Sequence, residues 1–154
     1  MKPCDLVPTA HVGAAFGGTA TLVGNTVVAN AQECTWSIAG PTLTGQVEIT
    51  VAFPDPATLN GGAADAVALV HYQHDFTVQN FPAKVADLQE VPGVGAYAFL
   101  DTYTRTLEVA VSPRLALVVQ YVSGSSADFG TGVSPAMLTA LTTMSATAAA
   151  DIGA

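Results

Sequence analysis

Cys4 and Cys34 are the only cysteines in the chain, and their positions constrain its fold more than any other feature. Cys4 lies at the chain start, just before a short helix-like segment. Cys34 lies beside Trp36, the only tryptophan, in an alternating stretch that is typical of a strand. A bond between them would attach the N-terminus to this strand and contribute roughly 3–4 kcal/mol on the chain-entropy estimate. We therefore favour a disulfide and an oxidising, extracytoplasmic location, with two reduced and buried thiols as the alternative.

Length and charge limit the class of protein. The 154 residues suit one domain, and we expect a single α+β domain over residues 1–154. The net charge is −8 and the chain has only four lysines and arginines, so it cannot form the basic surface that binds nucleic acid. No apolar run approaches the ~20 residues of a transmembrane segment, and the chain start lacks the features of a signal peptide. Neither nucleic acid nor a membrane span is expected.

The first half of the chain predicts one helix and three strands. Residues 3–18 indicate a tether and a short helix, capped by Thr9 or Asp5 and ended by two glycines. Residues 19–23 alternate as a strand, and a turn at Gly24 and Asn25 would continue it as a hairpin at residues 26–29. The next two strands are expected at residues 31–38 and 45–53, where apolar and polar residues alternate.

The second half repeats this order. A helix is expected at residues 63–76, strands at 97–100, 104–111 and 115–122, and a polar glycine-rich loop at 123–132. Ser134 and Pro135 are typical of a helix start, and the helix to residue 152 carries an apolar stripe that includes Leu141. The sequence therefore predicts an α+β fold in the order α-βββ-α-βββ-α: antiparallel sheets from two three-strand meanders, packed with three helices.

Several short motifs resemble one family. Pro3-Cys4-Asp5-Leu6-Val7, the following segment to Gly17, Cys34-Thr35-Trp36 and the glycine-rich turn Val91–Tyr97 are similar to motifs of uncharacterised secreted bacterial lipoprotein domains. Extracellular sensor domains of receptor-type bacterial Ser/Thr kinases have a similar α+β plan. The resemblance implies a cell-envelope location, a disulfide between Cys4 and Cys34, and no established enzymatic activity. No lipobox precedes Cys4, so lipid attachment cannot be read from the sequence.

The candidate site lies between the helix at residues 63–76 and the loop at 123–132. Its side chains combine apolar bodies with polar tips, as ligand pockets do: His71, Tyr72, His74 and Asp128. We expect a non-catalytic binding or sensor module for a small molecule, lipid or envelope protein. The alternative is a small hydrolase or isomerase that uses His71, His74 and Asp75. Two histidines without a defined third ligand do not predict a metal site, and no cofactor is expected.

Overall fold

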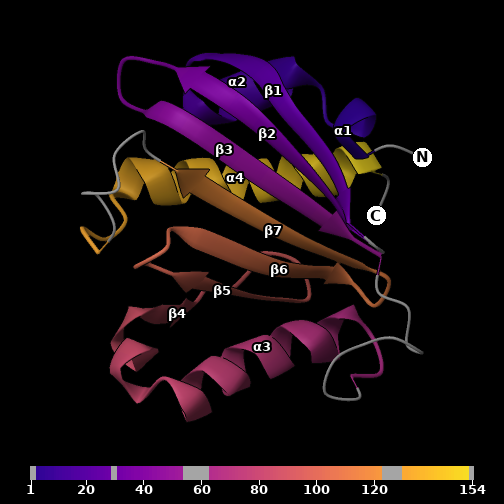
Figure 1. Cartoon of the computed structure of the whole chain (residues 1–154), viewed down its shortest axis with the longest axis vertical. Helices are drawn as coiled ribbons and strands as arrows, with labels where there is room; N and C mark the ends of the chain where they lie inside the picture. The colour runs from indigo at the N-terminus through magenta and orange to yellow at the C-terminus, as the bar shows by residue number, and fades with distance from the viewer. Residues whose placement is uncertain (1–2, 29–30, 54–62, 123–129, 153–154) are drawn as a thin grey trace.

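The protein is built on one seven-stranded antiparallel sheet, in the order β1-β2-β3-β7-β6-β5-β4 (Figure 1). A computed structural model describes residues 3–28, 31–53, 63–122 and 130–152. The strands are β1 (Thr19–Val28), β2 (Ala31–Ala39), β3 (Thr44–Ala52), β4 (Leu88–Glu90), β5 (Tyr97–Asp101), β6 (Thr106–Ser112) and β7 (Leu115–Val122). β3 pairs antiparallel with β7 at the centre of the sheet, and the expected α+β class with antiparallel pairing is confirmed.

Helices cover both faces of the sheet. They are α1 (Pro3–Leu6), α2 (Thr9–Phe16), α3 (Ala66–Asn80), the 3-10 helix η2 (Pro82–Asp87) and α4 (Pro135–Ile152). Three described segments are absent from the predicted order: the strand β4 and the two short helices α1 and η2. These three segments span three to six residues, too short for a periodic pattern to identify them.

Two local predictions near the N-terminus are wrong in detail. Thr9 is the first residue of α2 rather than its cap, and its Oγ1 accepts a hydrogen bond from Trp36 Nε1 at 3.2 Å. Strand β1 continues through Gly24 and Asn25 instead of turning there, because a β-bulge between Leu22 and Gly24 absorbs one residue. Gly17 ends α2 as expected, in the left-handed conformation that favours glycine.

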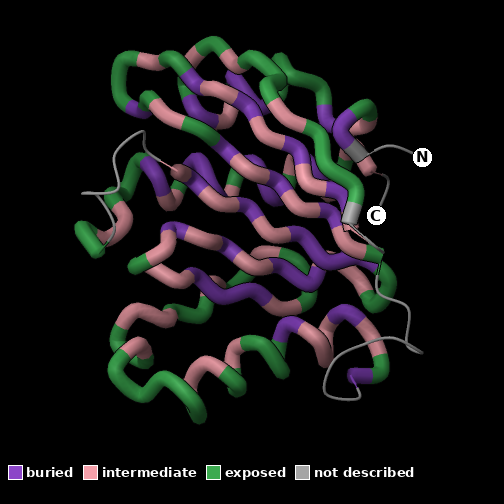
Figure 2. The backbone as a smooth tube through the Cα atoms, viewed as in Figure 1, coloured by how far each residue is buried: buried purple, intermediate pink, exposed green. Residues whose placement is uncertain are grey.

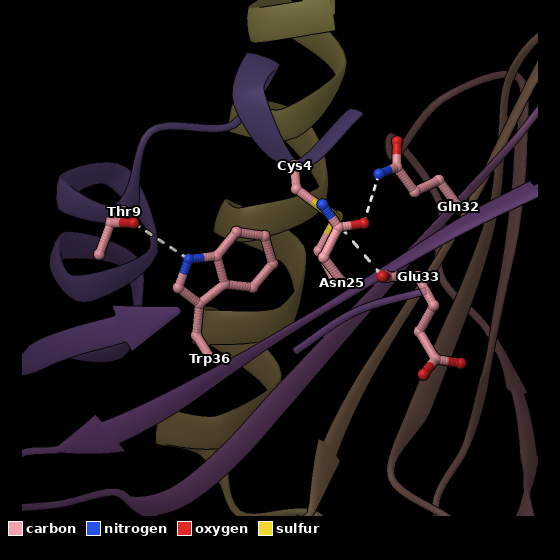
Figure 3. Close-up of a disulfide and its surroundings, with 7 residues drawn as sticks. Cys4, Thr9, Asn25, Gln32, Glu33 and Trp36 are labelled. Carbon is pink, nitrogen blue, oxygen red and sulfur yellow. Dashed lines mark hydrogen bonds between the residues drawn. A yellow bond between two sulfur atoms is a disulfide. The ribbon is translucent and has the colours of Figure 1, made fainter. Parts of the chain in front are cut away.

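The disulfide between Cys4 and Cys34 is present, with a Cα–Cα distance of 5.5 Å. It attaches α1 to β2, and Figure 3 shows it close to Trp36 and in front of α4. Both cysteines are buried, as is Trp36. The bond therefore holds the first residues of the chain against the core rather than at the surface.

The larger core lies between the sheet and the layer formed by α1, α2 and α4. Trp36, Leu141 and Met144 are fully buried in it, and Ser134 begins α4 as expected by accepting a hydrogen bond from the Met137 amide. Across the core, the rings of Phe16 and Tyr121 stack at 6.2 Å. The apolar stripe predicted for α4 is thus confirmed as its buried face.

Helix α3 covers part of the opposite face, over β5, β6 and β7 (Figure 1). A second, smaller core lies beneath it, and its buried members are few: Ala66, Val70, Phe99, Ala110 and Ala116. The small side chains of Ala110 and Ala116 let α3 approach the sheet closely. Much of α3 remains exposed, as the green segments of Figure 2 show.

Candidate functional site

Helix α3 begins at a well-defined cap. Asp65 adopts an extended backbone, and its Oδ1 accepts a hydrogen bond from the Ala68 amide at 2.9 Å. Such a cap satisfies one of the amides that a helix start leaves unpaired. Only Ala66 and Val70 are fully buried among the residues of α3. The other sides of the helix are therefore available for contacts beyond the fold.

Both candidate histidines pack against strand β5. The ring of His71 stacks on Tyr97 with centroids 3.6 Å apart and planes 18° apart. His74 places its ring edge-on to Phe99 at 5.3 Å. These contacts are typical of aromatic pairs that join a helix to a sheet. The histidines therefore fix α3 on β5, while His71 stays exposed at the surface.

The catalytic alternative finds no support in this geometry. His74 Nδ1 lies 3.1 Å from Asp75 Oδ1, its neighbour in the chain, and the side chain of Asp75 is 63% exposed. His71 stacks on Tyr97 instead of approaching this pair. Within the described ranges, no group of three or more His, Cys, Asp or Glu side chains could hold a metal ion. The arrangement resembles a surface contact more than an acid–base centre that would act on a substrate.

Three aromatic side chains form an exposed row on α3 and the turn that follows it: Tyr72, Phe76 and Phe81. Their side chains are exposed, at 37%, 45% and 50% respectively. Adjacent rings lie 6.0 Å and 6.3 Å apart, so the three are in contact. We call this set the aromatic row. Contiguous apolar patches on a soluble protein commonly mark an interaction site.

A hollow of 520 Å³ lies beside the aromatic row. Its walls are the aromatic, acidic and amide side chains on one face of α3: His71, Tyr72, Asp75, Phe76 and Gln79. Ala68 and Ala63 complete the lining with little bulk. The volume is within the range of small-ligand sites, and the mixture of ring faces with a few polar groups is what such sites use. Two of the predicted residues, His71 and Tyr72, therefore line one hollow.

The electrostatic field around the hollow is negative. Burial raises the pKa of the Tyr97 phenol, and the carboxylates of Glu90 and Asp75 raise it further. The Tyr97 hydroxyl donates a hydrogen bond to Glu90 at 3.5 Å. The described lining contains one carboxylate residue, Asp75, and neither lysine nor arginine. The site therefore disfavours anions and suits neutral or cationic groups.

The loop of the predicted site is described from Gly130 onward. Asp128 lies outside the described residues. The described end of the loop contacts the β5–β6 turn: the Gly130 amide donates to the Tyr103 carbonyl at 3.3 Å, and Arg105 donates to Thr131 Oγ1. The Lys84 ammonium of η2 lies over the Tyr103 ring, with Nζ 4.4 Å from the ring centroid. This part of the loop therefore lies against the β5–β6 turn.

Sequence reasoning overlooked Phe76, Phe81 and Gln79 as site residues. The sequence of α3 did contain a signal for them. Its apolar residues occur on more than one side of the helix, whereas packing on the sheet requires apolar residues on one side only. The position of Phe81 could not be read in this way. Phe81 follows the last residue of α3, and the path of the chain there places its ring 6.3 Å from that of Phe76.

Comparison with known proteins identifies no relative. No family model matches the chain, and neither the curated proteins nor the solved structures contain a match. Of the helices that the structure describes, none combines the length and the apolar character that crossing a bilayer requires.

Proposed function

We propose that the protein is a non-catalytic binding module of the cell envelope and that the outer face of α3 is its recognition surface. One observation carries the proposal: the 520 Å³ hollow lies beside three exposed aromatic rings that contact one another. The folded structure gains little from these rings at the surface, because each keeps more than a third of its area in contact with water. A ligand that covers them would gain this apolar contact.

The chemistry of the hollow narrows the ligand. Tyr72 and Phe76 offer ring faces on which a sugar ring, an apolar chain or an organic cation can lie. Asp75 and Gln79 can accept or donate hydrogen bonds at the rim. The negative field and the net charge of −8 oppose phosphates and other anionic head groups. Neutral saccharides and organic cations are the ligand classes that fit best.

The location in this proposal is extracytoplasmic, and the disulfide between Cys4 and Cys34 supports it. The resemblance of the cysteine motifs to secreted bacterial lipoprotein domains, and of the α+β plan to sensor domains of receptor kinases, points to the same compartment. Membership of that family and a sensor role belong to the proposal. Both agree with a recognition surface made of exposed aromatic rings beside a hollow.

Chemical-shift mapping tests the proposed site. ¹⁵N-labelled protein is titrated with neutral oligosaccharides, choline and short peptides, with inorganic phosphate as the anionic reference. We expect saturable shifts in the amides of α3 for at least one neutral or cationic probe, and their loss in Phe76→Ala. Val85→Ala removes an exposed apolar side chain outside the lining of the hollow and should bind normally. Shifts that cluster around the disulfide or the α4 layer would place the site elsewhere.

A further inference from the structure

The side of α3 that lines the hollow carries a carboxylate beside its aromatic rings. Tyr72, Asp75, Phe76 and Gln79 all belong to the lining. Tyr72 and Phe76 are four residues apart in the helix, as are Asp75 and Gln79, and side chains at this spacing are neighbours on one side of a helix. The charge of Asp75 therefore lies next to a pair of ring surfaces.

The two rings form one continuous apolar surface rather than a slot. The ring centroids of Tyr72 and Phe76 lie 6.0 Å apart, and the ring planes differ by 39°. A group held between two ring faces would keep them ~7 Å or more apart, because non-bonded carbon atoms approach to about 3.5 Å. A ligand must therefore lie across the exposed surface of both rings. Organic cations bind aromatic rings from such a position, within about 6 Å of a ring centroid.

The carboxylate of Asp75 keeps most of its capacity for a further partner. Its Oδ1 lies 3.1 Å from His74 Nδ1, and its side chain is 63% exposed. The described residues donate no hydrogen bond to its other oxygen, Oδ2. Because the described lining contains neither lysine nor arginine, no basic side chain of the hollow balances this negative charge.

Two of the four lysines and arginines of the chain are engaged away from the hollow. The Lys84 ammonium lies over the Tyr103 ring, where a cation meets an aromatic face within the fold itself. Arg105 donates a hydrogen bond to Thr131. Neither residue therefore supplies a cation to the rings beside Asp75.

We propose that the hollow binds an organic cation, with a quaternary ammonium group lying across the rings of Tyr72 and Phe76 and its charge close to Asp75. This inference rests on the proposed function and names the ligand class of the same site. A quaternary ammonium has no N–H group, so ring faces and a nearby carboxylate stabilise it better than hydrogen-bond acceptors do. The net charge of −8 also attracts such a ligand to the protein.

A neutral ligand would use the rings but not the charge. Covering a carboxylate removes part of its hydration, and a neutral saccharide supplies no opposite charge to offset that cost. A cation supplies this charge and makes the same apolar contact with the rings. The carboxylate of Asp75 thus separates the two ligand classes that the rings alone would accept.

Paired titrations test the proposal, with choline and with the neutral alcohol in which a carbon atom replaces the choline nitrogen. The two probes have the same shape and differ only in charge, and the amide shifts of α3 report the affinity of each. We expect choline to bind about threefold more tightly or better at low ionic strength, and added salt to weaken choline alone. Asp75→Asn should remove most of this preference. Asp5→Asn removes the same charge from an exposed site in the other layer and should bind like the unaltered protein.

Phe76→Leu supplies a second readout, because it keeps apolar bulk in the hollow but removes the ring. It should weaken choline and leave the affinity for the neutral alcohol nearly unchanged. Thermal melting of each variant checks that the fold is retained. Equal affinities for the two probes overturn the inference, and so does a preference for choline that persists in Asp75→Asn. If neutral saccharides shift α3 while choline does not, the inference falls and the proposed function stands; if no probe shifts α3, both fall.

Discussion

The two helical layers of this protein bury very different amounts of apolar surface. The layer of α1, α2 and α4 covers a core that includes Trp36, Leu141 and Met144, and a disulfide joins it to the sheet. The layer of α3 buries only Ala66 and Val70 from the helix itself. Yet α3 carries an exposed aromatic row and the hollow beside it. Most of the stabilising contacts therefore lie on one face of the sheet, and the proposed recognition surface lies on the other.

The physical reason is visible in the two helix sequences. α4 has its larger apolar residues on one stripe, so a single face contacts the core, and Met137, Leu141 and Met144 on it are buried. α3 buries only Ala66 and Val70 and adds the ring contacts of its two histidines with β5. Tyr72 and Phe76 of α3 remain exposed. Substitutions in the first layer should therefore change the free energy of unfolding, and substitutions in the second should change binding.

The largest effect is expected from Leu141→Asp. Leu141 is fully buried in the α4 layer, so the change both removes core volume and buries a carboxylate without a partner. We expect a loss of about 4–5 kcal/mol or more in the free energy of unfolding, measured by urea titration with Trp36 fluorescence. Val85→Asp, at an exposed position, is the control and should have little effect. An unchanged midpoint for Leu141→Asp would mean that α4 contributes nothing to the core.

The second effect is loss of the disulfide. Replacing both Cys4 and Cys34 by alanine should lower the free energy of unfolding by about 3–4 kcal/mol, because the unfolded chain gains the freedom that the bond removes. Thermal melting in reducing and non-reducing buffer gives the same comparison in the unaltered protein. Mass spectrometry after alkylation shows whether the bond exists. Two alkylated thiols in oxidised, freshly purified protein would contradict the structure.

The α4 layer and the disulfide are also the features that the sequence predicted best. The stripe of α4 and its Ser134 cap are local patterns, and β7 occurs at the expected residues because alternation and flanking turns define it. The course of β1 could not be predicted, because a glycine and an asparagine favour a turn unless the neighbouring strand imposes a bulge. The course of β1 is set by its pairing with β2, in which Leu22 lies opposite Trp36 and Gly24 opposite Thr35. Such pairing is a property of the tertiary structure.

The candidate site was predicted only in part, for a related reason. His71 and Tyr72 could be chosen for their side-chain chemistry, and both line the hollow. The stacking of His71 on Tyr97 depends on how α3 lies over β5, which no pattern within α3 specifies. The contact of Phe81 with Phe76 depends on the path of the chain after α3, for which the sequence has no periodic signal. The side-chain chemistry of the site residues could therefore be predicted from the sequence, whereas the contacts that arise from tertiary packing could not.

A third prediction concerns Glu108, on the α3 face of β6. Burial raises the pKa of its carboxyl to about 7, Asp101 adds to the shift, and its buried Oε2 has no hydrogen-bond partner among the described residues. The folded state thus holds the proton more tightly than the unfolded state, in which the carboxyl has its ordinary pKa of 4.5. The stability that Glu108 contributes is fully present below pH 4.5 and is lost as pH rises through 7.

The pKa shift of Glu108 sets the size of this effect on the free energy of unfolding. It amounts to about 3 kcal/mol between the acidic and the alkaline end of this pH range. Glu108→Gln removes the titrating group, so the variant should be more stable than the unaltered protein at pH 8 and similar to it near pH 4.5. Urea titrations across this range measure the difference. Asp5→Asn changes an exposed carboxylate in the other layer and serves as the control. A constant difference between Glu108→Gln and the unaltered protein at all pH values would contradict the assignment.

The smallest effect on stability, and the sharpest test of the comparison, comes from two phenylalanines. Phe16 is buried against Tyr121 in the first layer, whereas Phe76 is 45% exposed in the aromatic row. Phe16→Ala should cost about 3–5 kcal/mol, because it leaves a cavity in a packed core. Phe76→Ala should change the free energy of unfolding by about 0.5 kcal/mol or less, as surface substitutions commonly do.

Binding should respond in the opposite order. Phe76→Ala removes a wall of the hollow and should abolish the ligand-induced shifts in α3, although the protein remains fully folded. Phe16→Ala should keep those shifts at temperatures where the protein is still folded, since Phe16 does not line the hollow. A large loss of stability in Phe76→Ala would show that the aromatic row belongs to the core. In that case the exposed rings stabilise α3 on the sheet, and the division of roles between the two layers does not hold.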